Sequence, residues 1–219
     1  MQKLTLIVGN KAYSSWSMRP WLALRHAGAR FDEIRVPLYT PGYKAELLRL
    51  NPAGKVPALK SGDLVIWESL AICEYVAELF PPAKLWPADA SERAQARALC
   101  TEMHAGFTTI RTAMPFNCRA KGRQVASSAE LESEIARVQT IWRECRSAHA
   151  KRGPWLFGHF TIADAMFAPV ALRFLTYGVQ LDGVSGDYVD TVYKDRGVQD
   201  WIRAARHEHE VIPSSEVGQ

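Results

Sequence analysis

The amino-acid sequence predicts an α/β domain that is followed by an all-helical domain. Over the first eighty residues, short apolar runs rich in β-branched side chains alternate with segments of helical periodicity. Three prolines between residues 80 and 87 then interrupt this pattern, because closely spaced prolines cannot continue a helix. Beyond them we find helix-forming segments and no convincing strand. We therefore predict an α/β domain at 1–80, a linker at 81–88 and a helical domain at 89–219.

The predicted α/β domain begins with an apolar strand at 4–8, which a Gly-Asn turn closes. A helix should start near Ser17 or Met18, since Pro20 is tolerated in the first turn, and Gly28 is suited to end it. The remaining elements are expected in this order: a strand at 31–38, a turn at 39–42, a helix at 43–50, a hairpin turn at 61–63, a strand at 64–66 and a helix that follows Glu68-Ser69.

The predicted helical domain opens with a long helix-forming stretch at 90–113. Thr161 and Asp164 have the spacing of a capping box, to which we assign a role in folding and none in chemistry. Pro169 should bend or locally open the helix that follows. Between these segments, apolar residues recur at intervals of three and four, as in an amphipathic helix: Leu131, Ile135, Val138, Trp142 and Cys145.

Composition and charge exclude several classes of protein. The chain has 219 residues, of which 47% are hydrophobic and 23% are charged, values that exclude a disordered chain. The net charge is only +4, and the basic residues are scattered apart from one cluster at 119–123. We interpret this cluster as a solvated loop or an attraction for small anions, and we expect no nucleic-acid partner.

The cysteines and histidines indicate neither disulfides nor a metal site. Cys73, Cys100, Cys118 and Cys145 form no CxxC pair, so we expect free thiols in a reducing cytosol. The histidines lack the spacing of metal ligands. Residues 1–3 run directly into the first strand without a secretory segment, and no apolar run approaches a membrane span. We therefore expect a soluble, cytoplasmic protein without a membrane partner.

Several serine hydroxyls precede the first predicted helix. The unpaired N–H groups at a helix N-terminus, together with the helix dipole, favour an anion, and a thiolate is one such anion. A purely structural alternative is that Ser17 caps the helix and that the other serines belong to a loop.

Motifs spread over nearly the whole chain resemble those of the cytosolic glutathione S-transferases. These motifs are Ser14-Ser15-Trp16-Ser17-Met18-Arg19, Val56-Pro57, Glu68-Ser69, the proline-rich linker and Thr161-x-x-Asp164. The first is similar to the serine signature of the zeta class and its bacterial relatives. That class has cysteine at the position of Trp16 and a second arginine at that of Trp21, so both residues count against zeta-type isomerase activity. The resemblance implies a thioredoxin-like first domain that binds glutathione.

The same resemblance implies that Ser14 donates a hydrogen bond to the glutathione sulfur. A thiol has a pKa of about 8.5, and lowering it by about two units would ionise most of it at neutral pH. One hydrogen bond to a charged acceptor, worth roughly 1.5–3 kcal/mol, is of this size. Ser15 or Tyr13 could act instead, and Arg19 could orient the loop or hold a carboxylate.

Three further motifs are implied to hold glutathione. Val56-Pro57 would be a cis peptide whose preceding backbone pairs with the cysteinyl unit. Ser69 would bind the γ-glutamyl carboxylate at a helix N-terminus, while Glu68 pairs with the ammonium. For the glycyl carboxylate, the basic candidates are Lys55 and Lys44, with Tyr43 as another possibility.

The resemblance places the electrophile between the domains, where an apolar wall with a few polar groups suits a hydrophobic substrate. Trp16 would form part of this wall. The other candidates lie near the end of the first long helix of the second domain: Arg111, Met114, Phe116 and Asn117. Met114 and Phe116 fit a role in the core equally well.

These expectations lead to one principal function and two alternatives. The principal hypothesis is a cytoplasmic, homodimeric glutathione transferase that conjugates glutathione to a small hydrophobic electrophile, with no metal. The first alternative is a glutathione-dependent isomerase that acts on a maleylacetoacetate-type double bond. The second is a non-catalytic adaptor or stress protein with the same fold.

Overall fold

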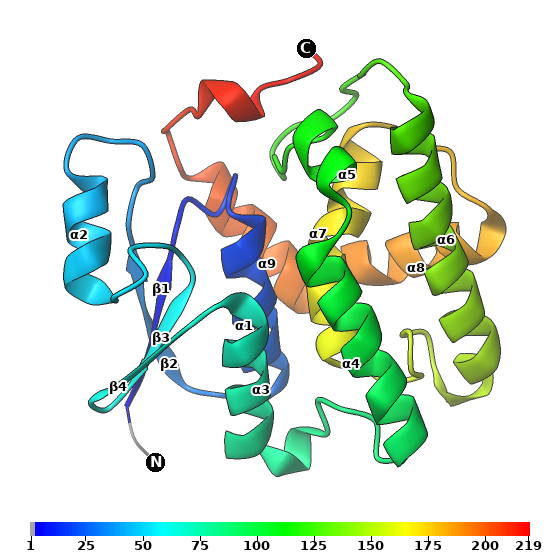
Figure 1. Cartoon of the computed structure of the whole chain (residues 1–219), viewed down its shortest axis with the longest axis horizontal. Helices are drawn as coiled ribbons and strands as arrows, with labels where there is room; N and C mark the ends of the chain where they lie inside the picture. The colour runs from blue at the N-terminus through cyan, green and yellow to red at the C-terminus, as the bar shows by residue number, and fades with distance from the viewer. Residues whose placement is uncertain (1–2) are drawn as a thin grey trace.

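The computed structural model describes residues 3–219, so Met1 and Gln2 lie outside the described residues. Its N-terminal part contains a sheet in the order β2-β1-β3-β4, in which β2 is parallel to β1 while β3 and β4 are antiparallel to their neighbours (Figure 1). The strands are β1 (Leu4–Val8), β2 (Phe31–Arg35), β3 (Ala58–Ser61) and β4 (Leu64–Trp67).

Helices cover both faces of this sheet. Side chains alternate between the faces of a strand, so Leu6 and Val8 of β1 join the large core formed with α1 (Ser15–His26) and α3 (Ser69–Leu79). Ile7 points to the other face and packs with α2 (Tyr43–Leu50) in a smaller cluster. The sheet is therefore the middle layer, with α2 on one side and α1 and α3 on the other.

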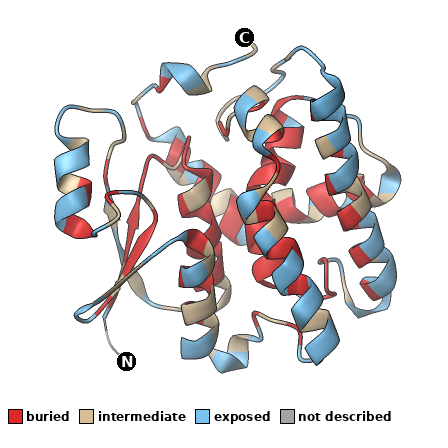
Figure 2. Cartoon of the chain, viewed as in Figure 1, coloured by how far each residue is buried: buried red, intermediate tan, exposed pale blue. Residues whose placement is uncertain are grey.

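The C-terminal part is built from helices around α7, most of which is buried (Figure 2). After β4, the described residues contain no further strand, only two isolated bridges within 155–159. The α-helices of this part are α4 (Ala90–Ala105), α5 (Thr108–Ala113), α6 (Ala129–His149), α7 (Ile162–Thr176), α8 (Gly183–Lys194) and α9 (Arg196–Arg206). The short 3-10 helices of the chain are η1 (Pro81–Ala83), η2 (Ala150–Arg152) and η3 (Pro213–Ser215).

The sequence predicted most elements closely but misplaced several boundaries. The first helix starts at Ser15, because Ser14 caps it. Strand β2 ends at Arg35, since Pro37 has no N–H for a ladder bond. Helix α7 remains helical through Pro169, so the helix does not open there, while the alternative expectation of a bend remains a prediction. The domain division at 81–88 remains a prediction.

The predicted single helix at 90–113 is wrong, because it breaks into α4 and α5 at Gly106 and Phe107. Phe107 adopts a left-handed backbone conformation (φ 55°), and its side chain is buried in the core. The new N-terminus of α5 is capped from another helix, since the Glu134 carboxylate accepts hydrogen bonds from the N–H groups of Thr109 (3.2 Å) and Ile110 (2.8 Å).

The predicted capping box at the start of α7 is confirmed. The Asp164 carboxylate accepts hydrogen bonds from the Thr161 N–H (2.8 Å), the Leu156 N–H (3.0 Å) and the Tyr188 hydroxyl (3.2 Å). Asp164 is fully buried, and burial raises the pKa of its carboxyl to about 6, although the hydrogen bonds act in the opposite direction. Asp164 therefore ties α7, α8 and the segment before α7 together.

We expect Asp164→Ala to lower the free energy of unfolding by about 2–4 kcal/mol, since two backbone N–H groups and the hydroxyls of Thr161 and Tyr188 lose their buried acceptor. Denaturant titration followed by tryptophan fluorescence measures this change. Asp187→Ala, on the exposed side of α8, is the matched control and should change the value by about 0.5 kcal/mol or less. Equal losses in the two variants would contradict the role assigned to Asp164.

Candidate active site

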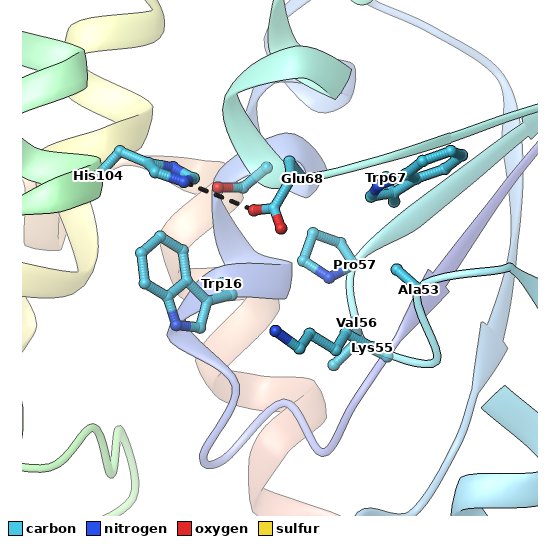
Figure 3. Close-up of a pocket in the computed structure, with 9 residues that line it drawn as sticks. Trp16, Ala53, Lys55, Val56, Pro57, Trp67, Glu68 and His104 are labelled. Atoms are coloured by element: carbon cyan, nitrogen blue, oxygen red, sulfur yellow. Dashed lines mark ion pairs between the residues drawn. The ribbon is translucent and has the colours of Figure 1, made fainter. Parts of the chain in front are cut away.

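Two cavities lie where the N-terminal sheet and loops meet the helical part, and they share Trp16, Lys55 and Val56. Figure 3 shows the residues that line the first of them. The first cavity has a volume of about 230 Å³, and the second of about 380 Å³. The other residues that line the first cavity are Ala53, Pro57, Trp67, Glu68, Ser69 and His104. The second is also lined by Tyr13, Ser14, Leu38, Tyr39, Tyr43, Lys44, Leu47, Gly54, Ile212 and Ser215.

Ser14 lies on the wall of the second cavity, at the point where the loop after β1 becomes α1. Its Oγ accepts a hydrogen bond from the Ser17 N–H (3.3 Å) and donates one to the Ser17 Oγ (2.8 Å). The Ser17 Oγ in turn accepts from the Gly9 N–H (3.1 Å). Ser14 thus caps α1 and also places its hydroxyl beside the cavity. Ser17, which was predicted to be the cap, instead accepts the hydrogen bond of the Ser14 hydroxyl.

The two alternative hydroxyls have other partners. Ser15 is buried, lines neither cavity, and accepts a hydrogen bond from the Arg173 guanidinium (3.3 Å). The Tyr13 hydroxyl donates to the Glu216 carboxylate and accepts from the Arg119 guanidinium, both at 2.6 Å. Of the three, only Ser14 both lines a cavity and has its hydroxyl bonded to a neighbouring serine instead of a charged side chain.

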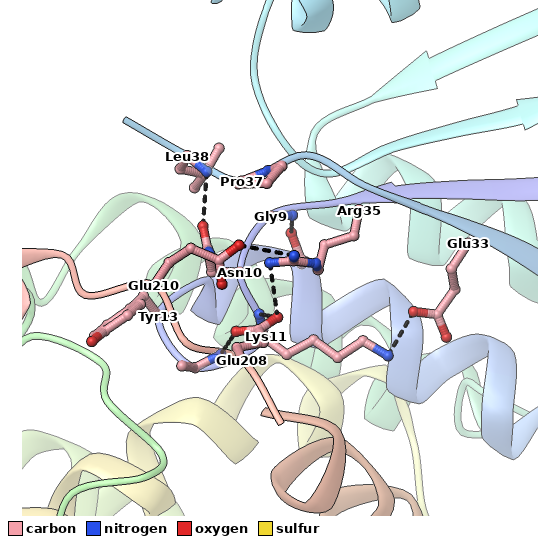
Figure 4. A network of polar contacts seen from close by, with 12 residues as sticks. Gly9, Asn10, Lys11, Tyr13, Glu33, Arg35, Pro37, Leu38, Glu208 and Glu210 are labelled. Atoms are coloured by element: carbon pink, nitrogen blue, oxygen red, sulfur yellow. Dashed lines mark hydrogen bonds and ion pairs between the residues drawn. The ribbon is translucent and has the colours of Figure 1, made fainter. Parts of the chain in front are cut away.

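The loop that presents Ser14 is fixed by hydrogen bonds to residues of other segments (Figure 4). The buried Glu208 carboxylate, which follows α9, accepts hydrogen bonds from the N–H groups of Lys11 (2.8 Å) and Ala12 (3.0 Å). On the other side, the Asn10 side-chain oxygen accepts from the Leu38 N–H (2.8 Å). These contacts fix the loop between the sheet and the C-terminal segment.

The first cavity combines a cis peptide, a strained residue and a helix N-terminus. The Val56-Pro57 bond is cis, as the resemblance implied. Glu68 has a positive φ of 68°, which sets the direction of the chain as it enters α3. Ser69 begins α3, and its Oγ is buried without a hydrogen-bond partner among the described residues. An unpaired hydroxyl at a helix N-terminus is suited to a carboxylate ligand.

The predicted lysines border the cavities. Lys55 lines both and is exposed. Lys44 lines the second cavity together with Tyr43, and its ammonium donates a hydrogen bond to the Gly54 carbonyl (3.4 Å). Both lysines are therefore within the site, where they add positive charge to its rim.

His104 is a residue of the site that the sequence did not predict, because the spacing of the histidines was informative only about metal ligands. His104 lies at the end of α4 and lines the first cavity. Its Nε2 lies 3.5 Å from the Glu68 carboxylate, and its ring packs edge-on against Trp16 with centroids 5.1 Å apart. Burial lowers the pKa of the imidazole. Within 3–219, no group of three or more His, Cys, Asp or Glu residues is arranged to hold a metal ion.

The structure separates the residues predicted for the electrophile. Trp16 lines both cavities, and the Arg111 guanidinium lies 5.6 Å from its ring centroid. Met114, Phe116 and Asn117 are buried and line neither of these cavities. The wall they were expected to form is supplied partly by Ile212 and Ser215, from the far end of the chain.

Two buried arginines lie close to this region. The Arg19 guanidinium stacks on Trp16 at 4.1 Å, and its Nε donates to the Met166 carbonyl (3.1 Å). Its Nη atoms have no hydrogen-bond partner among the described residues. Burial lowers the pKa of Arg19 and that of Arg173, the latter to about 9, and the nearby Arg111 lowers both further. Positive charge is thus concentrated behind Trp16.

The basic cluster at 119–123 was expected to be a solvated loop or an attraction for small anions. The first alternative is wrong for both of its arginines, although Lys121 is exposed. The Arg119 guanidinium donates to the carbonyls of Glu208 (2.6 Å) and Glu210 (3.0 Å). The Arg123 guanidinium pairs with the Glu216 carboxylate at 2.5 Å. Both arginines hold the segment that follows α9.

Comparison with known sequences identifies the family. The family model "Glutathione S-transferase, N-terminal domain" matches residues 13–79, and the model "Glutathione S-transferase, C-terminal domain" matches residues 93–206. The chain belongs to the glutathione S-transferase family. This match confirms the predicted family and the predicted fold class.

Two curated relatives and one solved structure show how far the similarity extends. A probable maleylacetoacetate isomerase of Caenorhabditis elegans is 37% identical over 50% of each chain. Glutathione S-transferase 1 of Dianthus caryophyllus is 39% identical over 42% of each. The chain therefore spans about half the length of the curated relatives it matches. A glutathione transferase homolog from Burkholderia has the same fold, with a TM-score of 0.71, 23% identity, and coverage of 95% of this chain and 100% of that one.

Ser17→Ala should lower the free energy of unfolding by about 1–2 kcal/mol, because the Gly9 N–H and the Ser14 hydroxyl both lose a buried partner. Chemical denaturation measures the loss. The same substitution at Ser133, on the exposed side of α6, is the control and should cost less than about 0.5 kcal/mol. A Ser17→Ala variant as stable as this control would show that the hydroxyl pair does not support the loop.

Proposed function

We propose that this protein is a glutathione transferase in which Ser14 stabilises the glutathione thiolate. The observation that carries the proposal is the Ser14 hydroxyl at the N-terminus of α1, in a cavity that shares Lys55 and Val56 with the cavity of Ser69. A ligand that spans both cavities would place its sulfur near Ser14 and a carboxylate near Ser69.

The residues of the first cavity fit the γ-glutamyl end of glutathione. The unpartnered Ser69 hydroxyl and the N-terminus of α3 suit its α-carboxylate. The Glu68 carboxylate suits the ammonium, and the backbone of Val56 suits the cysteinyl amide. Lys55 and Lys44, on the rim of the second cavity, suit the glycyl carboxylate. All of these residues belong to 1–80, the proposed glutathione-binding domain.

The chemistry follows from the charge on sulfur. The thiol loses its proton to solvent, and the Ser14 hydroxyl turns from Ser17 to donate its hydrogen bond to the thiolate. For an aryl halide, the sulfur then forms a C–S bond and the halide leaves with the electrons of the C–X bond. The hydroxyl and the dipole of α1 both favour the charged sulfur, which raises the fraction of the reactive form at neutral pH.

Ser14→Ala should raise the pKa of bound glutathione by about 1–2 units, since one hydrogen bond to a charged acceptor contributes roughly 1.5–3 kcal/mol. The ultraviolet absorbance of the thiolate, titrated against pH in the binary complex, measures this shift. Conjugation of an aryl halide at neutral pH should fall in parallel.

Ser15→Ala and Tyr13→Phe are the controls, because these hydroxyls are bonded to Arg173 and Glu216. Both should leave the thiolate pKa near the wild-type value. If the shift appears in one of them and not in Ser14→Ala, the role passes to that residue. Absence of glutathione binding to the wild-type protein would instead support the adaptor hypothesis.

The isomerase remains a second candidate because two observations favour it. The similarity to the probable maleylacetoacetate isomerase is one. The other is the positive charge of Arg19, Arg111 and Arg173 around Trp16, which would attract an electrophile that carries a carboxylate. Isomerisation needs the same thiolate: sulfur adds to the double bond, the bond rotates, and the thiolate leaves again.

Arg111→Met should separate the two activities. We expect it to reduce isomerisation of maleylacetone about tenfold or more, since a charge-assisted contact is lost, and to affect conjugation of an uncharged aryl halide less. Steady-state rates with both substrates give the comparison. Arg137→Met, at an exposed ion pair with Glu102, is the control. Wild-type protein that conjugates aryl halides but leaves maleylacetone unchanged would exclude the isomerase.

We further propose a cytoplasmic homodimer whose ligands are glutathione and a small hydrophobic electrophile, without a nucleic-acid or membrane partner. Residues 3–219 include no helix with both the length and the apolar character that crossing a bilayer requires. The modest net charge supports the absence of a nucleic-acid partner.

A further inference from the structure

We propose that Glu216 is a specificity-determining residue: its carboxylate holds the C-terminal segment 207–219 in place as a wall of the second cavity. This segment follows α9 and returns over the loop between β1 and α1 toward α5. The proposed function places the glutathione sulfur in the second cavity beside Ser14, and the electrophile must approach that sulfur, so the inference rests on the proposed function. We infer in addition that the segment, when Glu216 holds it in place, limits the size of the electrophile that the second cavity accepts.

The segment forms part of the cavity wall. Ile212 and Ser215 line the second cavity together with Tyr13 and Ser14. Ile212 is also buried against Ala12 and Tyr13, so it is anchored by apolar contact. From Ile212 to Ser215 the chain forms only the short helix η3, which begins at Pro213. Displacing this segment would open the second cavity on the side next to Ser14.

Glu216 is the polar anchor of this wall. Its carboxylate accepts hydrogen bonds from the Tyr13 hydroxyl (2.6 Å), the Asn117 amide (2.9 Å) and the Arg123 guanidinium (2.5 Å). These donors come from two separate parts of the chain: Tyr13 from the loop before α1, and Asn117 and Arg123 from the connection between α5 and α6. A charged acceptor with several donors is held more firmly than one with a single neutral bond.

The other polar contacts of the C-terminal segment hold its beginning and its end, so the part between them that lines the cavity depends on Glu216. Arg119 holds its beginning through the carbonyls of Glu208 and Glu210, and the Gln124 N–H donates to the Gly218 carbonyl near its end. Beyond these backbone contacts, Glu216 supplies the charged tie between Ile212 and the C-terminus.

The first cavity includes no residue of the C-terminal segment. Loss of the Glu216 contacts should therefore enlarge the electrophile side and leave the γ-glutamyl side unchanged. When an apolar pocket gains or loses the space of one methylene group, the ratio of kcat/KM between two substrates typically changes by roughly 10-fold or more. Glu216 should accordingly affect the choice between electrophiles far more than the affinity for glutathione, whose proposed contacts at Lys44, Lys55 and Ser69 come from other parts of the chain.

The test compares wild-type protein with Glu216→Ala and Glu216→Gln, using one small and one bulky aryl halide. We expect Glu216→Ala to raise the ratio of kcat/KM for the bulky over the small substrate about tenfold. Glu216→Gln, which keeps one acceptor oxygen without the charge, should give an intermediate ratio. Hydrogen exchange of residues 211–219 should speed up in the same order, and the glutathione Kd should stay within about twofold.

Glu210→Ala is the matched control, because this carboxylate lies in the same segment but pairs with Arg35 and lines neither cavity. Its substrate ratio should equal that of the wild type. An unchanged ratio in Glu216→Ala, with or without faster exchange, would overturn the inference while the proposed function stands. Wild-type protein that binds glutathione but conjugates neither halide, or that binds no glutathione, would overturn the proposed function and this inference with it.

Discussion

The position of the Ser14 hydroxyl depends on one interaction, the pair of hydrogen bonds between the Glu208 carboxylate and the backbone of Lys11 and Ala12. These residues are almost two hundred positions apart in the chain. A loop has no ladder of its own to satisfy its N–H groups, so a buried carboxylate that accepts two of them fixes its course. Ser17 then fixes the hydroxyl itself, because it bonds both to Ser14 and to the Gly9 N–H.

The site is therefore built by two parts of the chain with different tasks. The sheet, with its cis Val56-Pro57 and the strained Glu68, brings Val56, Ser69 and Ser14 to neighbouring cavities. The helical part contributes His104, the Arg111 guanidinium beside Trp16 and the C-terminal wall. Glu68, Ser69 and His104 line only the first cavity, whereas the second has a larger share of aromatic and aliphatic side chains, with Lys44 and Lys55 at its rim. This division matches a ligand with a charged end and a reactive end.

Features that depend on neighbours in sequence were predictable. Helix α2 has the predicted bounds, and the box of Thr161 and Asp164 forms as its spacing requires. The serine loop was recognised because residues next to each other carry its signature. In each case the interaction that decides the structure spans only a few positions, so periodicity and capping rules apply.

Features that depend on distant partners were not predictable. The break between α4 and α5 requires burial of Phe107 and a cap from Glu134, which lies more than twenty residues away. The sequence predicted Arg119 and Arg123 to be solvated, because their hydrogen-bond acceptors lie near the C-terminus and cannot be inferred from local spacing. His104 showed no motif at all, since its meaning comes from Trp16 and Glu68 on other elements.

The dependence of the serine loop on Glu208 has a consequence for the autonomy of the N-terminal unit. A fragment that ends at the proline-rich linker retains the sheet and the Ser69 helix but lacks the acceptor of the Lys11 and Ala12 N–H groups. In such a fragment water would replace the carboxylate, and the hydroxyl would sample many orientations. The nucleophile activation proposed for Ser14 would thus depend on a residue near the end of this sequence, although all residues that line the second cavity, apart from Ile212 and Ser215, lie within 13–56.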